Sequence, residues 1–122
     1  MRFSRSLKEN KLFRRLYAKG TSAANGYLVL YCRKNGLGEN RIGYTVSKKL
    51  GHAVVRNRVR RRLREIYRLH EAEFRPGYDL VVVARGRAVN ASYAKLERSM
   101  LSLASQLGVR SEKGDHPETS AD

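Results

Sequence analysis

The chain has few of the residues on which several protein classes depend. Its 122 residues include one cysteine and three histidines, so no internal disulfide can form and no set of metal-ligating side chains stands out. No stretch approaches 18 consecutive apolar residues, and the N-terminus lacks the apolar core of a signal peptide. We therefore expect a soluble protein of a reducing compartment, the cytoplasm, with no membrane partner.

Acidic side chains are also scarce, because 26 lysines and arginines stand against 11 acids, a formal net charge of +15. Residues 1–110 carry +18 and residues 111–122 carry −3. A surface this positive repels itself and is stabilised by a polyanion, which makes nucleic acid the expected partner. The length suits one domain. We place that domain at 1–110 and a disordered acidic tail at 111–122.

Hydrophobic spacing predicts an alternation of helices and strands. Ser6 and Glu9 have the spacing of a capping box, before a helix that would end at Gly20. The remaining expected elements are strands at 27–33 and 41–47 that pair as a hairpin, a helix at 52–74, a central strand at 78–84 buried on both faces, and a helix at 93–107. One face of the sheet is expected to carry a row of tyrosines.

The helix at 52–74 carries the strongest functional signal, since seven of the thirteen residues from 56 to 68 are arginine. Like charges four residues apart weaken a helix by a few tenths of a kcal/mol per pair. A phosphate backbone would turn that repulsion into attraction, and the planar guanidinium can hold phosphate and stack on bases. A solvated helix face is the alternative, but few acids are near enough to neutralise this one. The pattern therefore favours RNA contact beside a narrow apolar seam, which consists of Val55, Val59, Leu63, Ile66 and His70.

Aromatic residues offer a second candidate surface. Tyr27, Tyr31 and Tyr44, with Phe13 and Tyr17 from the first helix, would form a floor on which single-stranded bases stack at about 1–3 kcal/mol each. Core packing is the alternative, and for Phe13 and Tyr44 both interpretations stay open. The polar tips of Tyr17 and Tyr31 favour a half-open binding surface.

The histidines and the cysteine predict no catalytic centre in the protein. His52, His70 and His116 are dispersed, and no carboxylate pair or nucleophile arrangement stands near them. We expect His70 to be a packed structural residue. Cys32 lies in an apolar strand, so we expect an inert core thiol.

Residues 47–65, Ser-Lys-Lys-Leu-Gly-His-Ala-Val-Val-Arg-Asn-Arg-Val-Arg-Arg-Arg-Leu-Arg-Glu, closely resemble the signature of the bacterial ribonuclease P protein family. Further segments between residues 7 and 107 stand in the family's order. The resemblance implies an α+β fold, an αβββαβα two-layer sandwich similar to the ribosomal protein S5 domain 2-like fold. It also implies a short strand near 20–25 and a left-handed βαβ crossover through the arginine helix.

In the family that the chain resembles, an RNA is the catalyst and removes the 5′ leader of precursor tRNA by Mg²⁺-dependent hydrolysis. The expected partners are therefore ribonuclease P RNA, bound 1:1, and precursor tRNA, with Mg²⁺ required by the holoenzyme and any metal site on the protein left open. His52 stands where the family often has asparagine and would be a poorer helix cap. We expect RNA contacts from Lys48, Lys49, Arg56, Asn57, Arg60, Arg61, Arg64, Arg68 and Arg85, and a leader-binding cleft lined by Phe13, Tyr17 and Tyr31.

Three other classes compete with this hypothesis. A generic basic RNA binder, such as a small ribosomal protein, would need only the charge, and its aromatic residues would be core. A DNA-binding basic helix would need a leucine heptad or a helix-turn-helix, and neither follows residue 68. A membrane-surface helix would need a broader apolar face with Trp or Phe anchors.

Overall fold

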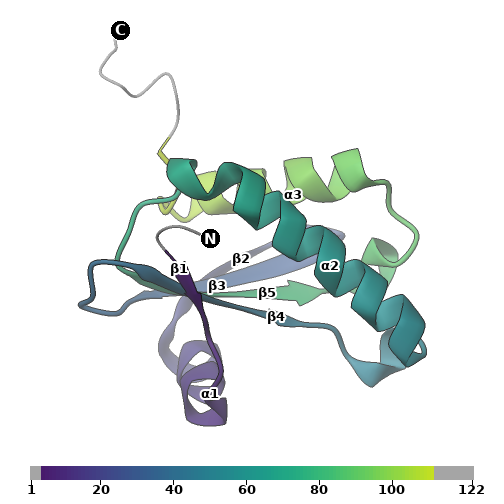
Figure 1. Cartoon of the computed structure of the whole chain (residues 1–122), viewed down its shortest axis with the longest axis horizontal. Helices are drawn as coiled ribbons and strands as arrows, with labels where there is room; N and C mark the ends of the chain where they lie inside the picture. The colour runs from purple at the N-terminus through teal and green to yellow at the C-terminus, as the bar shows by residue number, and fades with distance from the viewer. Residues whose placement is uncertain (1–3, 112–122) are drawn as a thin grey trace, which may run out of the picture.

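The computed structural model describes residues 4–111 as a five-stranded sheet with helices on both faces (Figure 1). Helix α1 covers one face, and α2 and α3 cover the other. This confirms the α+β fold, including the short strand near 20–25, while the predicted tail beyond Ser111 lies outside the described residues. The elements are β1 (Ser4–Ser6), α1 (Asn10–Lys19), β2 (Thr21–Ala24), β3 (Leu28–Lys34), β4 (Asn40–Thr45), η1 (Lys48–Leu50), α2 (Ala53–His70), η2 (Glu71–Glu73), β5 (Tyr78–Ala84), η3 (Gly86–Ala88) and α3 (Tyr93–Gln106).

Strand β5 occupies the centre of the sheet, whose order is β1-β4-β5-β3-β2. It runs parallel to β4 and antiparallel to β3, and Leu80, Val81 and Val82 are almost completely buried. The expectation of a central strand buried on both faces is confirmed. The expected hairpin between β3 and β4 is wrong, because the more apolar β5 takes the place between them.

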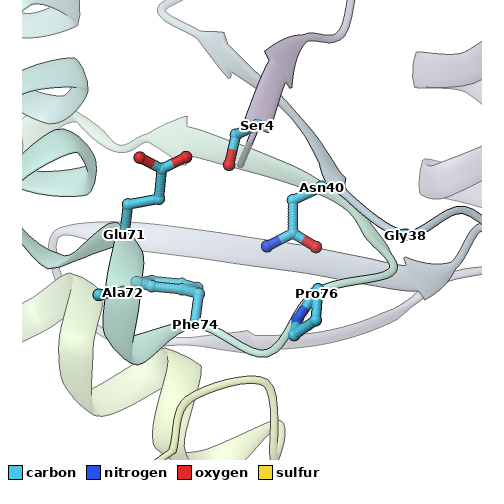
Figure 2. A pocket seen from close by; sticks show the side chains of 7 residues that line it. All are labelled: Ser4, Gly38, Asn40, Glu71, Ala72, Phe74 and Pro76. Carbon is cyan, nitrogen blue, oxygen red and sulfur yellow. The ribbon is translucent and has the colours of Figure 1, made fainter. Parts of the chain in front are cut away.

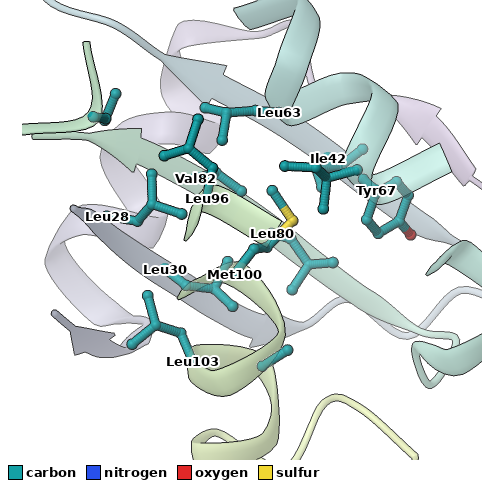
Figure 3. Packing of buried hydrophobic residues seen from close by; sticks show 14 of the residues in the cluster. Leu28, Leu30, Ile42, Leu63, Tyr67, Leu80, Val82, Leu96, Met100 and Leu103 are labelled. Atoms are coloured by element: carbon teal, nitrogen blue, oxygen red, sulfur yellow. The ribbon is translucent and has the colours of Figure 1, made fainter. Parts of the chain in front are cut away.

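The larger core lies between the sheet and the pair α2 and α3 (Figure 3). Alternation along β3 sends Leu28, Leu30 and Cys32 into this core, as the sequence predicts for a strand with one buried face. Burial raises the pKa of the Cys32 thiol, although a hydrogen bond with Thr21 opposes the shift. Cys32 is therefore the inert core thiol that the sequence predicts. A smaller cluster under α1 packs on the opposite face.

The capping box predicted at Ser6 and Glu9 is wrong. Ser6 belongs to β1, where it pairs with Ile42, and the Leu7 amide donates to the Ile42 carbonyl at 2.8 Å. This pairing holds Ser6 in the sheet, so α1 begins at Asn10 after Glu9, whose side chain makes no capping bond. The three-residue strand β1 has no hydrophobic pattern, which is why the sequence does not predict it.

Helix α2 ends at His70, before the predicted residue 74, and gives way to the η2 turn. The His70 ring lies between two carboxylates, with Nδ1 2.6 Å from Glu73 and Nε2 2.7 Å from Glu97 of α3. Carboxylates only accept hydrogen bonds, so both nitrogens donate when the ring is charged. Burial disfavours that charge, but the two hydrogen bonds outweigh it and raise the pKa of His70. His70 thus ties α2 to α3, in agreement with its predicted structural role.

Candidate nucleic-acid interface

The arginines of α2 divide between two sides of its buried seam. Val59, Leu63, Ile66 and Tyr67 are buried against the sheet. At 100° per residue, the stripe of Arg56, Arg60, Arg64 and Arg68 begins within the edge of that seam and continues on one side of it, with Asn57 and Arg61 beside it. Arg56 is accordingly half-buried, and its Nε donates to the Gly51 carbonyl at 3.1 Å. Arg58 and Arg62 fall on the other side, toward α3, where the Arg62 Nη1 donates to the Ala91 carbonyl at 3.1 Å. These two arginines are not among the RNA-binding residues expected from the sequence, although the same helical angles separate them from the stripe.

Most arginines of the stripe, and Arg61 beside it, are not paired with an acidic side chain. Within residues 4–111, Arg61 and Arg64 form no ion pair and no side-chain hydrogen bond, and both are exposed. The Arg60 Nη2 donates to the Asn57 amide oxygen at 2.8 Å, which leaves the guanidinium charge unneutralised. Arg68 differs, because both its Nε and Nη2 donate to Glu65, at 3.0 and 2.6 Å. The charge of the stripe is therefore strongest toward the N-terminal half of α2.

Of the remaining predicted RNA-binding residues, two precede α2 in the chain and the third follows β5. Lys48 and Lys49 are exposed on the η1 turn just before the helix. Arg85 follows the end of β5 and donates from Nη1 to the Asn25 carbonyl at 2.9 Å. His52 is the N-cap residue of α2 and makes no side-chain capping bond, which agrees with the expectation of a poor cap.

An open aromatic hollow of about 380 Å³ lies where α1, the end of β4 and α2 meet. It is lined by Asn10, Phe13, Tyr17, Tyr44, Thr45, Val46 and Arg60. Tyr17 is 41% exposed, and its hydroxyl shares a 2.8 Å hydrogen bond with Thr45. Tyr31 meets the Tyr17 ring edge-on at 5.0 Å between centroids, so it adjoins the hollow without lining it.

Gly43 gives Phe13 its place at this hollow. A Cβ atom at Gly43 would lie 2.5 Å from the Phe13 ring, closer than any van der Waals contact allows. The bare backbone of β4 therefore lets the ring rest on the strand. Phe13 packs with the cluster under α1 and also lines the hollow, so its core role and its exposure in the hollow coexist.

The expected row of tyrosines on one sheet face is wrong. Tyr31 is paired with Val81, and Tyr44 with Val82. Because successive residues of β5 point to opposite faces, the two tyrosines do so as well. Tyr31 packs under α1, whereas Tyr44 packs against the larger core and reaches the hollow from the edge of β4. Tyr27 lies elsewhere, on the α3 side.

Arg60 joins the two predicted sites, since it belongs to the stripe and also lines the aromatic hollow. From the sequence, the arginines and the aromatic residues are expected to form separate surfaces. Asn10 and Thr45 also line the hollow, and no signal in the sequence marks them. The combined surface offers aromatic rings and an unneutralised cation to one ligand, which is the chemistry that binds single-stranded nucleic acid.

A more enclosed cavity of about 280 Å³ lies between β1, the start of β4 and η2 (Figure 2). Its polar side chains already serve the fold. The Tyr67 hydroxyl lies 2.7 Å from the Ser4 hydroxyl and accepts from the Asn40 amide at 3.2 Å, while the Asn40 oxygen accepts from the Tyr78 amide. We therefore assign this cavity no binding role.

The part of the chain that the structure describes contains no group of three His, Cys, Asp or Glu side chains placed to hold a metal ion. None of its helices combines the length and the hydropathy needed to cross a bilayer.

The fold and the combined surface define a class of small α+β proteins in which a basic helix adjoins an aromatic hollow at the sheet edge. The family model for ribonuclease P matches residues 1–108. The ribonuclease P protein component of Thermoanaerobacter sp. (strain X514) is 47% identical over 97 residues, which are 80% of this chain and 84% of the relative. That of Caldanaerobacter subterraneus subsp. tengcongensis is 45% identical over 107 residues, 88% of this chain and 92% of the relative.

Solved structures agree with these relatives. The ribonuclease P protein of Staphylococcus aureus superposes with a TM-score of 0.80 at 34% identity, covering 86% of this chain and 96% of that one. The protein from Thermotoga maritima gives 0.74 at 30% identity, covering 80% and 92%. The chain therefore belongs to the ribonuclease P protein family, whose curated members are protein components of ribonuclease P. Membership implies a place in a tRNA-processing ribonucleoprotein with ribonuclease P RNA as partner.

Proposed function

We propose that the chain binds the catalytic ribonuclease P RNA through the stripe on α2 and holds the 5′ leader of precursor tRNA in the aromatic hollow. The RNA carries out the Mg²⁺-dependent hydrolysis, and the protein strengthens the binding of substrate. One protein binds one RNA, in the cytoplasm. Lys48, Lys49 and Arg85 extend the RNA contact beyond α2.

The position of Arg60 is the observation that supports this proposal most directly. Arg60 lines the aromatic hollow, and its helix also carries the exposed Arg61 and Arg64. A leader strand with its bases on Tyr17 would have its phosphates within reach of a cation. The same helix would hold the larger RNA on its outer side, so Arg60 would lie between the bound leader and the bound catalytic RNA.

The chemistry of the described side chains supports a non-catalytic role. His70 is held between two carboxylates and Cys32 is buried, so neither is free to act as a nucleophile or proton carrier at the hollow. In the proposal, Mg²⁺ is held by the RNA, and the protein contributes positive charge and stacking surfaces.

The test is the rate of correct 5′ cleavage of a precursor tRNA by a bacterial ribonuclease P RNA transcript at low Mg²⁺, with and without the full chain. We expect the protein to accelerate cleavage and to be inert alone, with saturation at one protein per RNA. An unchanged rate with a competent RNA that the protein still binds would favour the generic basic binder. Cleavage by the protein alone would overturn the non-catalytic role.

A further inference from the structure

A second basic surface lies on the α3 side of α2. A hollow of about 430 Å³, which we call the α3 hollow, is lined by Tyr27, Arg87, Asn90, Ala91, Ser92 and Lys95. Arg62 borders it from α2, because its guanidinium donates to the Ala91 carbonyl. The α3 hollow thus adjoins Arg62, one of the two arginines on the side of α2 away from the stripe.

Arg87 rests against Tyr27 on the rim of this hollow. Its guanidinium carbon lies 4.8 Å from the centre of the Tyr27 ring, and its Nη2 donates to the Tyr27 hydroxyl at 3.3 Å. The absence of a side chain at Gly26 leaves space for this guanidinium, since a Cβ atom there would lie 2.8 Å from the Arg87 Nη1. The ammonium of Lys95 stands 5.7 Å from the same ring. Two positively charged groups therefore lie close to the ring of Tyr27.

Neither cation is neutralised by an acid. Within residues 4–111, Arg87 and Lys95 form no ion pair, and the carboxylate nearest along α3, Glu97, bonds to His70. Two like charges gathered on one ring repel each other unless an anion joins them. A ring face attracts cations but leaves their N–H groups free to donate, so both remain able to bind an oxyanion. Because Arg87 already contacts Tyr27, binding would cost less side-chain entropy than ordering an arginine that has no such contact.

We propose that the α3 hollow binds the phosphate backbone of a second segment of the ribonuclease P RNA. This inference rests on the proposed function, because its ligand is the same RNA that the stripe binds. The RNA is the occupant that the geometry favours over the leader. The hollow lies on the α2 and α3 face of the sheet and shares α2 with the stripe, whereas Phe13 and Tyr17 belong to α1 on the opposite face. The contact is to phosphate, since the cations occupy the ring face on which a base would stack.

The test compares the double variant Arg87→Gln/Lys95→Gln with the wild type in binding to a ribonuclease P RNA transcript over a range of salt concentrations. Each phosphate contact contributes about 0.7–0.9 to the slope of log affinity against log salt. Loss of two contacts should make the slope shallower by about 1.5 and weaken binding about 30-fold at 0.1 M salt. The matched control is Arg33→Gln/Lys34→Gln, which removes the same charge from exposed residues at the opposite end of β3.

The outcomes separate this inference from the proposed function. A shallower slope in the Arg87 and Lys95 variant, with the control close to wild type and both variants folded by circular dichroism, supports the α3 hollow. Equal small losses in both variants would mean that only net charge matters and would overturn the inference. An unchanged slope in the first variant, beside a reduced slope in Arg61→Gln, would overturn the inference and leave the proposed function standing. A wild-type chain that does not bind the RNA would overturn both.

Discussion

Tyr17 is the residue at which leader binding can be separated from folding. Tyr17 is 41% exposed and lines the aromatic hollow, so replacement by alanine removes a stacking surface and little of the core. A base stacked on an aromatic ring contributes about 1–3 kcal/mol. Since each 1.4 kcal/mol is a factor of ten, Tyr17→Ala should weaken binding of leader-bearing precursor tRNA to the holoenzyme by about 5- to 150-fold.

The assay measures the affinity of the reconstituted holoenzyme for precursor tRNA with a leader and for the same tRNA without one. Tyr17→Ala should lower the first affinity and leave the second unchanged. Tyr17→Phe keeps the ring and loses only the exposed hydrogen bond to Thr45, so it should stay close to wild type. An equal loss for both substrates, or no loss in a folded Tyr17→Ala chain, would refute leader stacking on this ring.

Three further perturbations follow from the structure. Replacing Arg61 and Arg64 with glutamine should weaken binding of the ribonuclease P RNA more than binding of the leader. If the stripe and its neighbours make roughly five phosphate contacts, the wild-type slope of log affinity against log salt should be about −4. A slope near zero, measured by filter binding, would contradict the electrostatic account. The pKa of His70 is raised in the folded chain, so the stabilisation from its two carboxylates is complete below the unfolded pKa of about 6.5 and is lost as pH rises through the folded value. The thermal midpoint of the wild type should therefore fall more between pH 6 and pH 9 than that of His70→Gln, and parallel curves would exclude this linkage. Gly43→Ala places a methyl group against Phe13 and should lower the free energy of unfolding by about 1–3 kcal/mol, which chemical denaturation measures; a variant as stable as the wild type would show that the ring moves freely.

Periodic burial is the part of the fold that the sequence predicts well. The alternation in β3 places its buried residues correctly, and the seam of α2 correctly includes Val59, Leu63 and Ile66, because each pattern follows from the geometry of a single element. The predicted seam misses Tyr67, which is also buried, and includes Val55 and His70, which are only half-buried. The continuous apolar run of β5 likewise predicts burial on both faces. These features need no knowledge of which element lies beside which.

Pairing between distant segments is the part that the sequence does not predict. Strands β3 and β4 have good hairpin patterns, yet β5 separates them, and that choice depends on the whole sheet. The same limit applies to the candidate site. The sequence identifies Arg60 and Tyr17 singly, but their meeting in one hollow depends on how α2 and α1 pack on the two faces of β4. Tyr31 and Tyr44 fall on opposite faces because of a one-residue offset along β5, which no local pattern encodes.

The central place of β5 also has a consequence for the order in which the chain folds during synthesis. Both of its partners precede it in the chain, and its contacts reach back to residues 28–34 and 41–45. Until residue 84 has left the ribosome, β3 and β4 have no strand to join them, and each presents an unpaired edge. The sheet can therefore close only late, after α2 with its arginines is already exposed. A nascent chain of this protein therefore exposes its most basic segment to the RNA-rich surroundings of the ribosome before its hydrophobic core has formed.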